Sequence, residues 1–155
     1  MITKRQFEKL RKFVRFANGL STLSNCSRKR TGAIVFPLDF TEVLSIGYNG
    51  PATGVPNDKC NGQEGKCGCA HAELNAICKM HTQKTGNVIF TTMQPCVACA
   101  NAIINCGQIS KVIYQEPYRD TSCIMLFEYA RIPVIYWSKD YATFCQRWKA
   151  SSECI

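Results

Sequence analysis

Hydrophobic residues at three- and four-residue steps open the chain, where Phe7, Leu10, Val14 and Ala17 recur between lysines and arginines. This spacing predicts an amphipathic helix that covers one face of a sheet. The turn-forming pair Asn18-Gly19 marks the expected end of the helix.

The pattern then changes to runs of β-branched and aromatic residues. Residues 32–36 and 43–48 predict two strands, and the five residues 37–41 suit a hairpin loop between them. Residues 50–69 are rich in Gly, Pro, Asn and Cys and have no period. They predict a loop, and one of this length usually has a function.

Beyond the loop, helical and strand patterns alternate. Helices are expected from residue 71 to about 78 and over 96–106, 121–130 and 141–149, with strands over 88–92, 111–114 and 133–137. This order predicts the α/β class, a three-layer α/β/α sandwich around a central mixed five-stranded sheet whose later strands are parallel. With 155 residues, of which 46% are hydrophobic, the chain is expected to form one domain over residues 1–155.

Composition narrows the possible classes of protein. The chain has no apolar run of the roughly 20 residues that cross a bilayer, and its start lacks the apolar stretch of a signal peptide. We therefore expect a cytoplasmic protein that does not bind membranes. In that compartment the eleven cysteines indicate metal ligands rather than disulfides.

A net charge of +8 favours anionic partners, such as nucleotide phosphates or a polynucleotide. The basic residues concentrate in Lys4 to Lys12 and in Arg28-Lys29-Arg30. Either run could equally be a solvated surface, so charge alone does not choose a partner.

Two short segments carry the clearest chemistry, His71-Ala72-Glu73 and Pro95-Cys96-Val97-Ala98-Cys99. An H-x-E motif followed by P-C-x-x-C is the signature of zinc-dependent nucleobase deaminases. Ligation by His71, Cys96 and Cys99 leaves the fourth tetrahedral position to water. Glu73 has no purpose in a purely structural site, so we expect it to be the general acid and base. The alternatives are a closed site with an undetected fourth ligand, or a degenerate deaminase fold that only binds.

A second cysteine cluster lies just before His71. Cys60, Cys67 and Cys69 on the long loop, together with Cys26, could form a structural zinc site with four thiolates that stabilises the loop. The alternatives are unliganded thiols or another fourth ligand such as His81, although His81 is more typical of a helix end. The remaining cysteines are interpreted as core or incidental thiols: Cys78, Cys106, Cys123, Cys145 and Cys154.

Three segments together resemble the deoxycytidylate (dCMP) deaminase family: Gly47-Tyr48-Asn49-Gly50, residues 69–77 and residues 95–100. The resemblance covers about residues 25–137. It implies the cytidine deaminase fold and zinc-dependent hydrolysis of dCMP to dUMP and ammonia, which supplies the precursor of dTMP. It also implies a homo-oligomer, commonly a hexamer, that is activated by dCTP and inhibited by dTTP.

Residue by residue, the resemblance places zinc on His71, Cys96 and Cys99, and the proton shuttle on Glu73. It places Asn49 at the base or sugar, a role that suits an amide with both donor and acceptor, and Ala72 is expected beside the substrate. The segment Gly47, Tyr48, Asn49 and Gly50 is a possible effector site, although the chain continues with Pro51-Ala52-Thr53-Gly54 where cellular members have a Pro-Arg-Gly turn. Some viral members hold a second zinc at places that match Cys26, Cys60 and Cys69.

The sequence contains no specific motif for binding the phosphate and sugar of the substrate. Tyr118, Arg119 and Asp120 are the candidates, with Arg28 and Arg30 as alternatives, because an arginine can bind a phosphate through paired hydrogen bonds. A surface salt bridge would explain such an arginine equally well.

Three rival functions remain at this point. One is a deaminase of tRNA adenosine or single-stranded DNA cytidine, against which the loop at 50–69 argues. Another acts on 5-methyl-dCMP or dCTP, and the third is a nucleotide-binding module without turnover.

Overall fold

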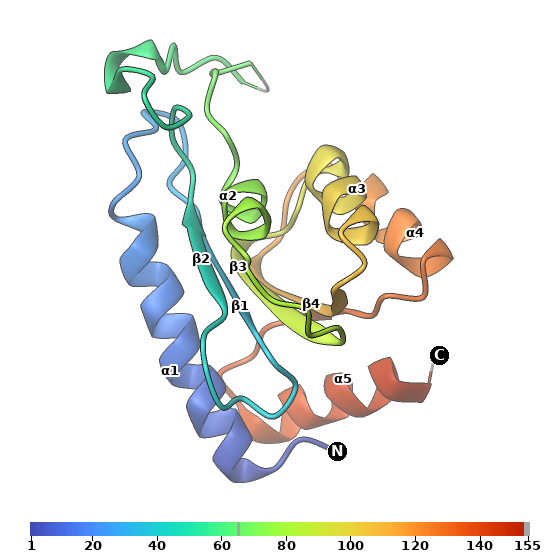
Figure 1. Ribbon diagram of the computed structural model, residues 1–155. Helices are drawn as coiled ribbons and strands as arrows, with labels where there is room; N and C mark the ends of the chain where they lie inside the picture. The colour runs from blue at the N-terminus through green and yellow to red at the C-terminus, as the bar shows by residue number, and fades with distance from the viewer. Residues whose placement is uncertain (65, 154–155) are drawn as a thin grey trace.

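A five-stranded mixed sheet forms the centre of the molecule, in the order β2-β1-β3-β4-β5 (Figure 1). The computed structural model describes residues 1–64 and 66–153. β1 is antiparallel to both β2 and β3, whereas β3, β4 and β5 run parallel. The strands are β1 (Gly32–Phe36), β2 (Ser45–Tyr48), β3 (Asn87–Met93), β4 (Ile109–Glu116) and β5 (Val134–Tyr136).

Helices cover both faces of the sheet, which confirms the predicted three-layer sandwich. α1 (Lys4–Ser21) and α5 (Tyr141–Glu153) lie on one face, and α2 (Ala72–Cys78), α3 (Val97–Asn105) and α4 (Ser122–Tyr129) lie on the other (Figure 1). Within the described residues, none of the helices has the length and apolar character that crossing a bilayer requires.

Strand alternation divides the core into two apolar layers. Ile34 and Phe90 point toward α1 and α5, while their neighbours Val35 and Ile89 point toward α2 and α3. All four side chains are fully buried. This is the pattern expected of central strands with helices on both faces.

The first helix is longer than predicted. It runs through Gly19 to Ser21 because Leu20 is buried in the core, and the Thr22 amide then caps the helix by donating to the carbonyls of Gly19 and Leu20. The helix therefore ends two residues later than the predicted end at Asn18-Gly19. At the other end of the chain, the predicted 141–149 helix likewise continues to Glu153.

The β1–β2 connection is also longer than predicted. β2 begins at Ser45 rather than at residue 43. The connection is longer because the side chain of Phe40 packs into the core. The ring of Phe40 is buried and packs 5.2 Å from the ring of Phe36 and 6.0 Å from that of Trp148. A tight hairpin would leave this ring in solvent.

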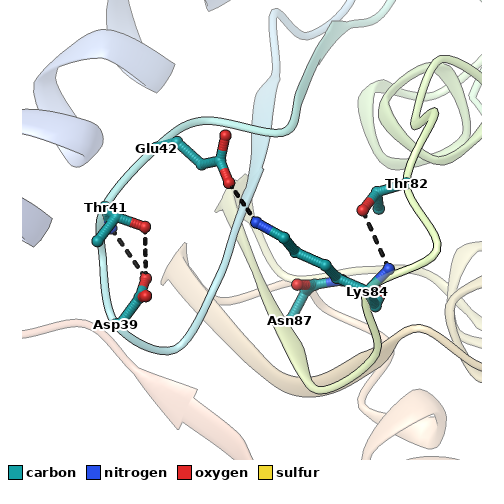
Figure 2. Close-up of polar contacts among 6 residues, drawn as sticks. All are labelled: Asp39, Thr41, Glu42, Thr82, Lys84 and Asn87. Carbon is teal, nitrogen blue, oxygen red and sulfur yellow. Dashed lines mark hydrogen bonds and ion pairs between the residues drawn. The ribbon is translucent and has the colours of Figure 1, made fainter.

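Polar contacts hold the same connection in place at its outer edge (Figure 2). Asp39 accepts hydrogen bonds from the amide and hydroxyl of Thr41, at 3.1 and 2.6 Å. Glu42 accepts one from Lys84, in the segment before β3, at 2.6 Å. The side chains of Glu42 and Lys84 are about half exposed, so this ion pair adds little to stability.

A long segment projects from the end of the sheet where β1 begins and β3 ends (Figure 1). It contains the short 3-10 helix η1 (Asn57–Lys59), and an antiparallel bridge between Gly50 and Ala70 closes its base. The bridge brings the end of this predicted loop beside the end of β2. His71 follows the bridge directly, so the fold places the loop next to the expected zinc site.

Candidate zinc centre and nucleotide pocket

Two helix N-termini bring the expected zinc ligands together. His71 is the residue before α2, Cys96 is the residue before α3, and Cys99 lies in the first turn of α3. His71 Nδ1 lies 3.2 Å from Cys99 Sγ and 3.4 Å from Cys96 Sγ. The three ligand atoms all lie within 4.8 Å of one another.

This donor set fits zinc. Zn–S bonds of about 2.3 Å and Zn–N bonds of about 2.0–2.1 Å in tetrahedral geometry separate a sulfur from a nitrogen by about 3.6 Å. The two nitrogen–sulfur distances above are close to this value, so His71, Cys96 and Cys99 could hold the ion with small movements. Three ligands leave one tetrahedral position open, as in catalytic zinc sites.

The contacts between Cys96 and Cys99 also shift their pKa values in a way that favours binding of a cation. The Cys99 thiol donates a hydrogen bond to Cys96, and this contact is the main reason that the pKa of Cys96 falls to about 3. The pKa of Cys99 is raised, first by the same contact and then by burial. The hydrogen bond with Cys96 raises the pKa of His71. These contacts favour the thiolate form of Cys96, which is the form that binds a metal ion.

Glu73 lies in the first turn of α2, and its side chain is only 4% exposed. Burial is the main cause that raises the pKa of this carboxyl above its ordinary value. Ala72, between the ligand and the carboxylate, is fully buried in the apolar layer of α2 and α3. The spacing thus brings the side chains of His71 and Glu73 to the pocket wall. Ala72, expected beside the substrate, does not line the pocket and packs in the core instead.

A pocket of about 320 Å³ adjoins this centre, and His71, Glu73 and Cys96 all line it. The volume is within the range of small-molecule sites, about 300–1,000 Å³. Of the sequence candidates for substrate contact, the pocket brings together four: Asn49, Tyr118, Arg119 and Arg28.

Besides Ala72, two further candidates, Arg30 and Asp120, do not line the pocket. Arg30 is exposed. The Asp120 carboxylate accepts a hydrogen bond from the Ser122 amide at 2.9 Å, at the start of α4, and contacts with Ser122 lower the pKa of Asp120. Asp120 is thus placed to end the loop and begin the helix.

Asn49 has a structural role that the sequence did not indicate. Its Oδ1 accepts from the Thr31 amide, and its Nδ2 donates to the Lys29 carbonyl, both at 2.7 Å. These bonds fix the segment before β1 against the end of β2. The remaining N–H of the amide is not used by these contacts, so Asn49 could both brace the pocket wall and contact a ligand.

Gln94, directly after β3, is a pocket residue that the sequence reading missed. It is 3% exposed and lines the pocket. Its Oε1 accepts from the Tyr118 amide, and its Nε2 contacts the Asp120 carbonyl, both at 3.4 Å. Gln94 therefore positions the segment that carries Tyr118 and Arg119. Its partners are more than twenty residues away, so no local pattern could have revealed this role.

Gly47 allows α2 to approach the sheet. A Cβ atom at Gly47 would lie 2.1 Å from the Ala72 carbonyl oxygen and 2.6 Å from the Ala76 amide nitrogen. At Gly50, apart from its two chain neighbours, no atom of residues 1–64 and 66–153 lies within 4 Å of the equivalent position. Tyr48 is not a pocket residue, and the Lys79 ammonium lies 5.9 Å from its ring centre. The contacts of Gly47 are with α2, which begins next to the candidate zinc ligand His71.

We expect Gly47→Ala to lower the free energy of unfolding by about 1–3 kcal/mol, because the added methyl group collides with helix backbone that carries His71 and Glu73. Chemical denaturation measures the change. Gly50→Ala in the same tetrapeptide is the matched control and should stay much closer to wild type. Equal stability of the two variants would contradict the role of Gly47 in seating α2.

The second cysteine cluster also comes together. Cys26, Cys60, Cys67 and Cys69 place their sulfur atoms within 4.8 Å of one another. The sulfurs of Cys26 and Cys60 are 3.7 Å apart, close to the roughly 3.8 Å between two thiolates on one tetrahedral zinc. Hydrogen bonds from the Ser27 and Gly62 amides lower the pKa of Cys60 to about 6. The four thiols are compatible with a closed structural zinc site.

The other candidate ligands lie outside both groups. His81 is exposed and follows α2 by three residues, rather than ending the helix as expected. Of the thiols interpreted as core or incidental, Cys123 is buried, Cys106 and Cys145 are partly buried and Cys78 is exposed. Cys154 lies outside the described residues.

Comparisons with known proteins give the same family as the motifs. The family model for the cytidine and deoxycytidylate deaminase zinc-binding region matches residues 7–116. Deoxycytidylate deaminase of Mycobacterium phage D29 is 30% identical over 121 residues, which cover 67% of this chain and 91% of the phage protein. Deoxycytidylate deaminase of Saccharomyces cerevisiae is 29% identical over 119 residues, which cover 69% of this chain and 37% of the yeast protein. The match thus spans little more than a third of the yeast relative.

Among solved structures, the dCMP deaminase of the cyanophage S-TIM5 in complex with dCMP and dUMP aligns with a TM-score of 0.74. It is 28% identical, and the alignment covers 88% of this chain and all of the phage chain. The matched family region contains Glu73 and the three ligands of the first cluster. The chain therefore belongs to the cytidine and deoxycytidylate deaminase family.

Proposed function

We propose that this protein catalyses the zinc-dependent hydrolytic deamination of dCMP to dUMP. The observation that carries the proposal is the pocket itself, where a three-ligand zinc set and the buried carboxyl of Glu73 share one small-molecule cavity. A structural zinc site has no use for such a carboxyl. The complex of the S-TIM5 dCMP deaminase with dCMP and dUMP supports the choice of substrate.

Zinc, when bound, lowers the pKa of water to about 7 and so supplies the nucleophile near neutral pH. His71, Cys96 and Cys99 would hold the ion. Water must add to the ring carbon that bears the amino group, the adjacent ring nitrogen must gain a proton, and ammonia must leave with another. Glu73 is proposed to take the proton that water gives up, pass it to the ring nitrogen and deliver the second to the departing amine.

The environment of Glu73 suits this proton transfer. A carboxyl with an ordinary pKa holds a proton too weakly near neutral pH to act as a general acid. Burial raises the pKa of Glu73, which lets it hold and return a proton closer to neutral pH. The neutral base and sugar would lie against uncharged lining residues such as Asn49, whose amide still offers one N–H. Tyr118 and Arg119, held by Gln94, are proposed to contact the sugar and phosphate.

The second cluster is proposed to hold a structural zinc ion, so that the chain would bind two ions in all. Cys67 and Cys69 come shortly before His71, and Cys26 comes shortly before β1. An ion on these cysteines would therefore fix the long loop to the sheet beside the pocket. Assembly as a homo-oligomer, possibly a hexamer, and control by dCTP and dTTP are proposed from the family resemblance.

Ammonia release by the zinc-loaded protein tests the proposed substrate. The panel contains dCMP, 5-methyl-dCMP, dCTP, deoxycytidine and a cytidine-containing oligonucleotide, with and without dCTP or dTTP as effector. We expect turnover of dCMP-like monophosphates to exceed that of the other compounds. Turnover of the oligonucleotide alone would make the protein a polynucleotide deaminase, and binding of dCMP without ammonia release would make it a binding module.

A further inference from the structure

Glu64 bridges two arginines from distant parts of the chain at the pocket. Arg28 precedes β1 and Arg119 follows β4, while Glu64 lies on the long cysteine-bearing loop. Arg28 Nη2 lies 3.4 Å from Glu64 Oε1, and Arg119 Nη1 makes an ion pair with the same oxygen. All three residues line the pocket that contains Glu73 and His71. The two guanidinium groups thus converge on one anionic oxygen.

The neighbouring charged groups have other partners. Lys29 pairs with Glu116 at 2.8 Å, and Asp120 accepts from the Ser122 amide. Among the described residues that line the pocket, Glu64 and Glu73 are the acidic ones. Glu73 belongs to the zinc centre, so Glu64 is the acidic group that the two arginines share here.

A carboxylate is a weaker partner for this pair than a phosphate would be. Two guanidinium groups offer several N–H donors in planar forks, which match the oxygens of a phosphate. A phosphate monoester carries a charge of about −1.5 to −2 and three terminal oxygens, whereas a carboxylate carries one charge and two oxygens. The site therefore favours exchange of the carboxylate for a phosphate.

The exposure of the Glu64 and Arg119 side chains makes this exchange easy. The side chain of Arg119 is 63% exposed and that of Glu64 is 51% exposed, whereas that of Arg28 is 29% exposed. Ion pairs at such positions contribute little to folding stability, because solvent screens them. Breaking the contacts of Glu64 would therefore leave the fold intact. The ring of Tyr118, 5.7 Å from the Arg119 guanidinium, would still limit the movement of that arginine.

For a nucleotide whose phosphate lies at Arg28 and Arg119, we infer that Glu64 is a tethered carboxylate that occupies the two arginines and that this phosphate must displace. The inference rests on the proposed function, because it takes the pocket to hold a nucleotide.

Glu64 then acts as an internal competitor. A nucleoside without a phosphate cannot displace it and leaves the arginines paired with Glu64. A nucleotide monophosphate exchanges the carboxylate for a better ligand and gains affinity. Because the carboxylate is tethered near the arginines, its effective concentration is high, and the competition weakens binding of every phosphate compound. Glu64 thus lowers the affinity for phosphate compounds and takes no part in the chemistry at the ring.

The variants Glu64→Gln, Arg119→Gln and Arg28→Gln test the inference through KM for dCMP and for deoxycytidine. Removal of the competitor in Glu64→Gln should lower KM for dCMP by about two- to fivefold, the range of a single exposed ion pair. Loss of either arginine should raise KM for dCMP by about ten- to a hundredfold, as expected for hydrogen bonds to a charged group. Each change should shift KM for dCMP several times more than KM for deoxycytidine, which carries no phosphate.

Matched controls remove the same charges elsewhere. Glu42→Gln removes a half-exposed carboxylate paired with Lys84, and Arg11→Gln removes an arginine paired with Glu8. Both should behave as wild type, which separates the site from the effect of net charge. Zinc content and thermal unfolding of every variant show whether the fold is kept.

Calorimetric titration with inorganic phosphate tests the site without any turnover. Phosphate should bind more tightly to Glu64→Gln than to wild type, and more weakly to both arginine variants. If no substrate is deaminated but phosphate binding changes in this way, the inference stands and the proposed function falls. If dCMP is deaminated but KM for dCMP and phosphate binding are the same in wild type and in Glu64→Gln, the inference is wrong, whatever the arginine variants do.

Discussion

Glu73→Gln is expected to lower kcat for dCMP by at least about a thousandfold while the protein keeps its zinc. General acid–base catalysis by one group contributes about 10²–10⁴-fold, and here one carboxylate is proposed to carry both proton transfers. Glutamine has nearly the shape of glutamate but cannot accept and return a proton. His71, Cys96 and Cys99 are unchanged in this variant, so metal binding should persist. Ammonia release under saturating dCMP measures the effect.

Glu42→Gln is the matched control, because it makes the same chemical change in the β1–β2 connection, away from the pocket. It should retain wild-type kcat. Zinc content, measured on the same samples by atomic emission, should be equal in wild type and both variants. Wild-type turnover by Glu73→Gln would rule out the proton-transfer role, and loss of zinc from this variant would mean that Glu73 supports the metal site instead.

Cys26→Ser is expected to reduce the zinc content from two ions to one per chain and to destabilise the protein. Structural zinc binding in small domains is worth about 10–16 kcal/mol, so loss of one thiolate from a closed site has a large effect. We expect the free energy of unfolding to fall by about 3 kcal/mol or more. For a chain of this size, a drop of 3 kcal/mol lowers Tm by roughly 6–12 °C.

Cys78→Ser is the control for this variant, because Cys78 is an exposed cysteine outside both clusters. It should keep both ions and the wild-type Tm. Two zinc ions per chain in Cys26→Ser would exclude Cys26 from the second site. A normal zinc content together with a lowered Tm would show that Cys26, which is 4% exposed, acts through packing alone.

The sheet and its layers could be predicted because the information is local. Alternation in residues 32–36 and 88–92 and the helical spacing of Phe7, Leu10 and Val14 each occur within one element. Element boundaries were less certain, because tertiary contacts decide them. Leu20 extends α1 and Phe40 lengthens the β1–β2 connection through contacts with distant parts of the core.

The arrangement of the zinc centre could be anticipated from sequence for a related reason. One residue separates His71 from Glu73, and two separate Cys96 from Cys99, so each half of the site occupies a single helix start. The motifs therefore specify local geometry. The fold has only to bring two helix N-termini together, which it does by placing α2 and α3 on one face of the sheet.

The rest of the pocket could not be predicted in this way. Gln94 acts through backbone groups of residues 118 and 120, and Glu64 acts through arginines at positions 28 and 119. These partners are tens of residues apart, and the same residue types are common on any surface. Asn49 was named for its amide, but its contacts with the Lys29 carbonyl and Thr31 amide depend on how two segments meet.

Conversion of dCMP by the purified protein, followed by chromatography for dUMP together with an ammonia assay, tests the central claim most directly. The zinc-loaded protein should form dUMP and ammonia in equal amounts. A chelator should stop the reaction, and added zinc should restore it. Failure of the zinc-loaded, folded protein to form more dUMP than Glu73→Gln would contradict the account.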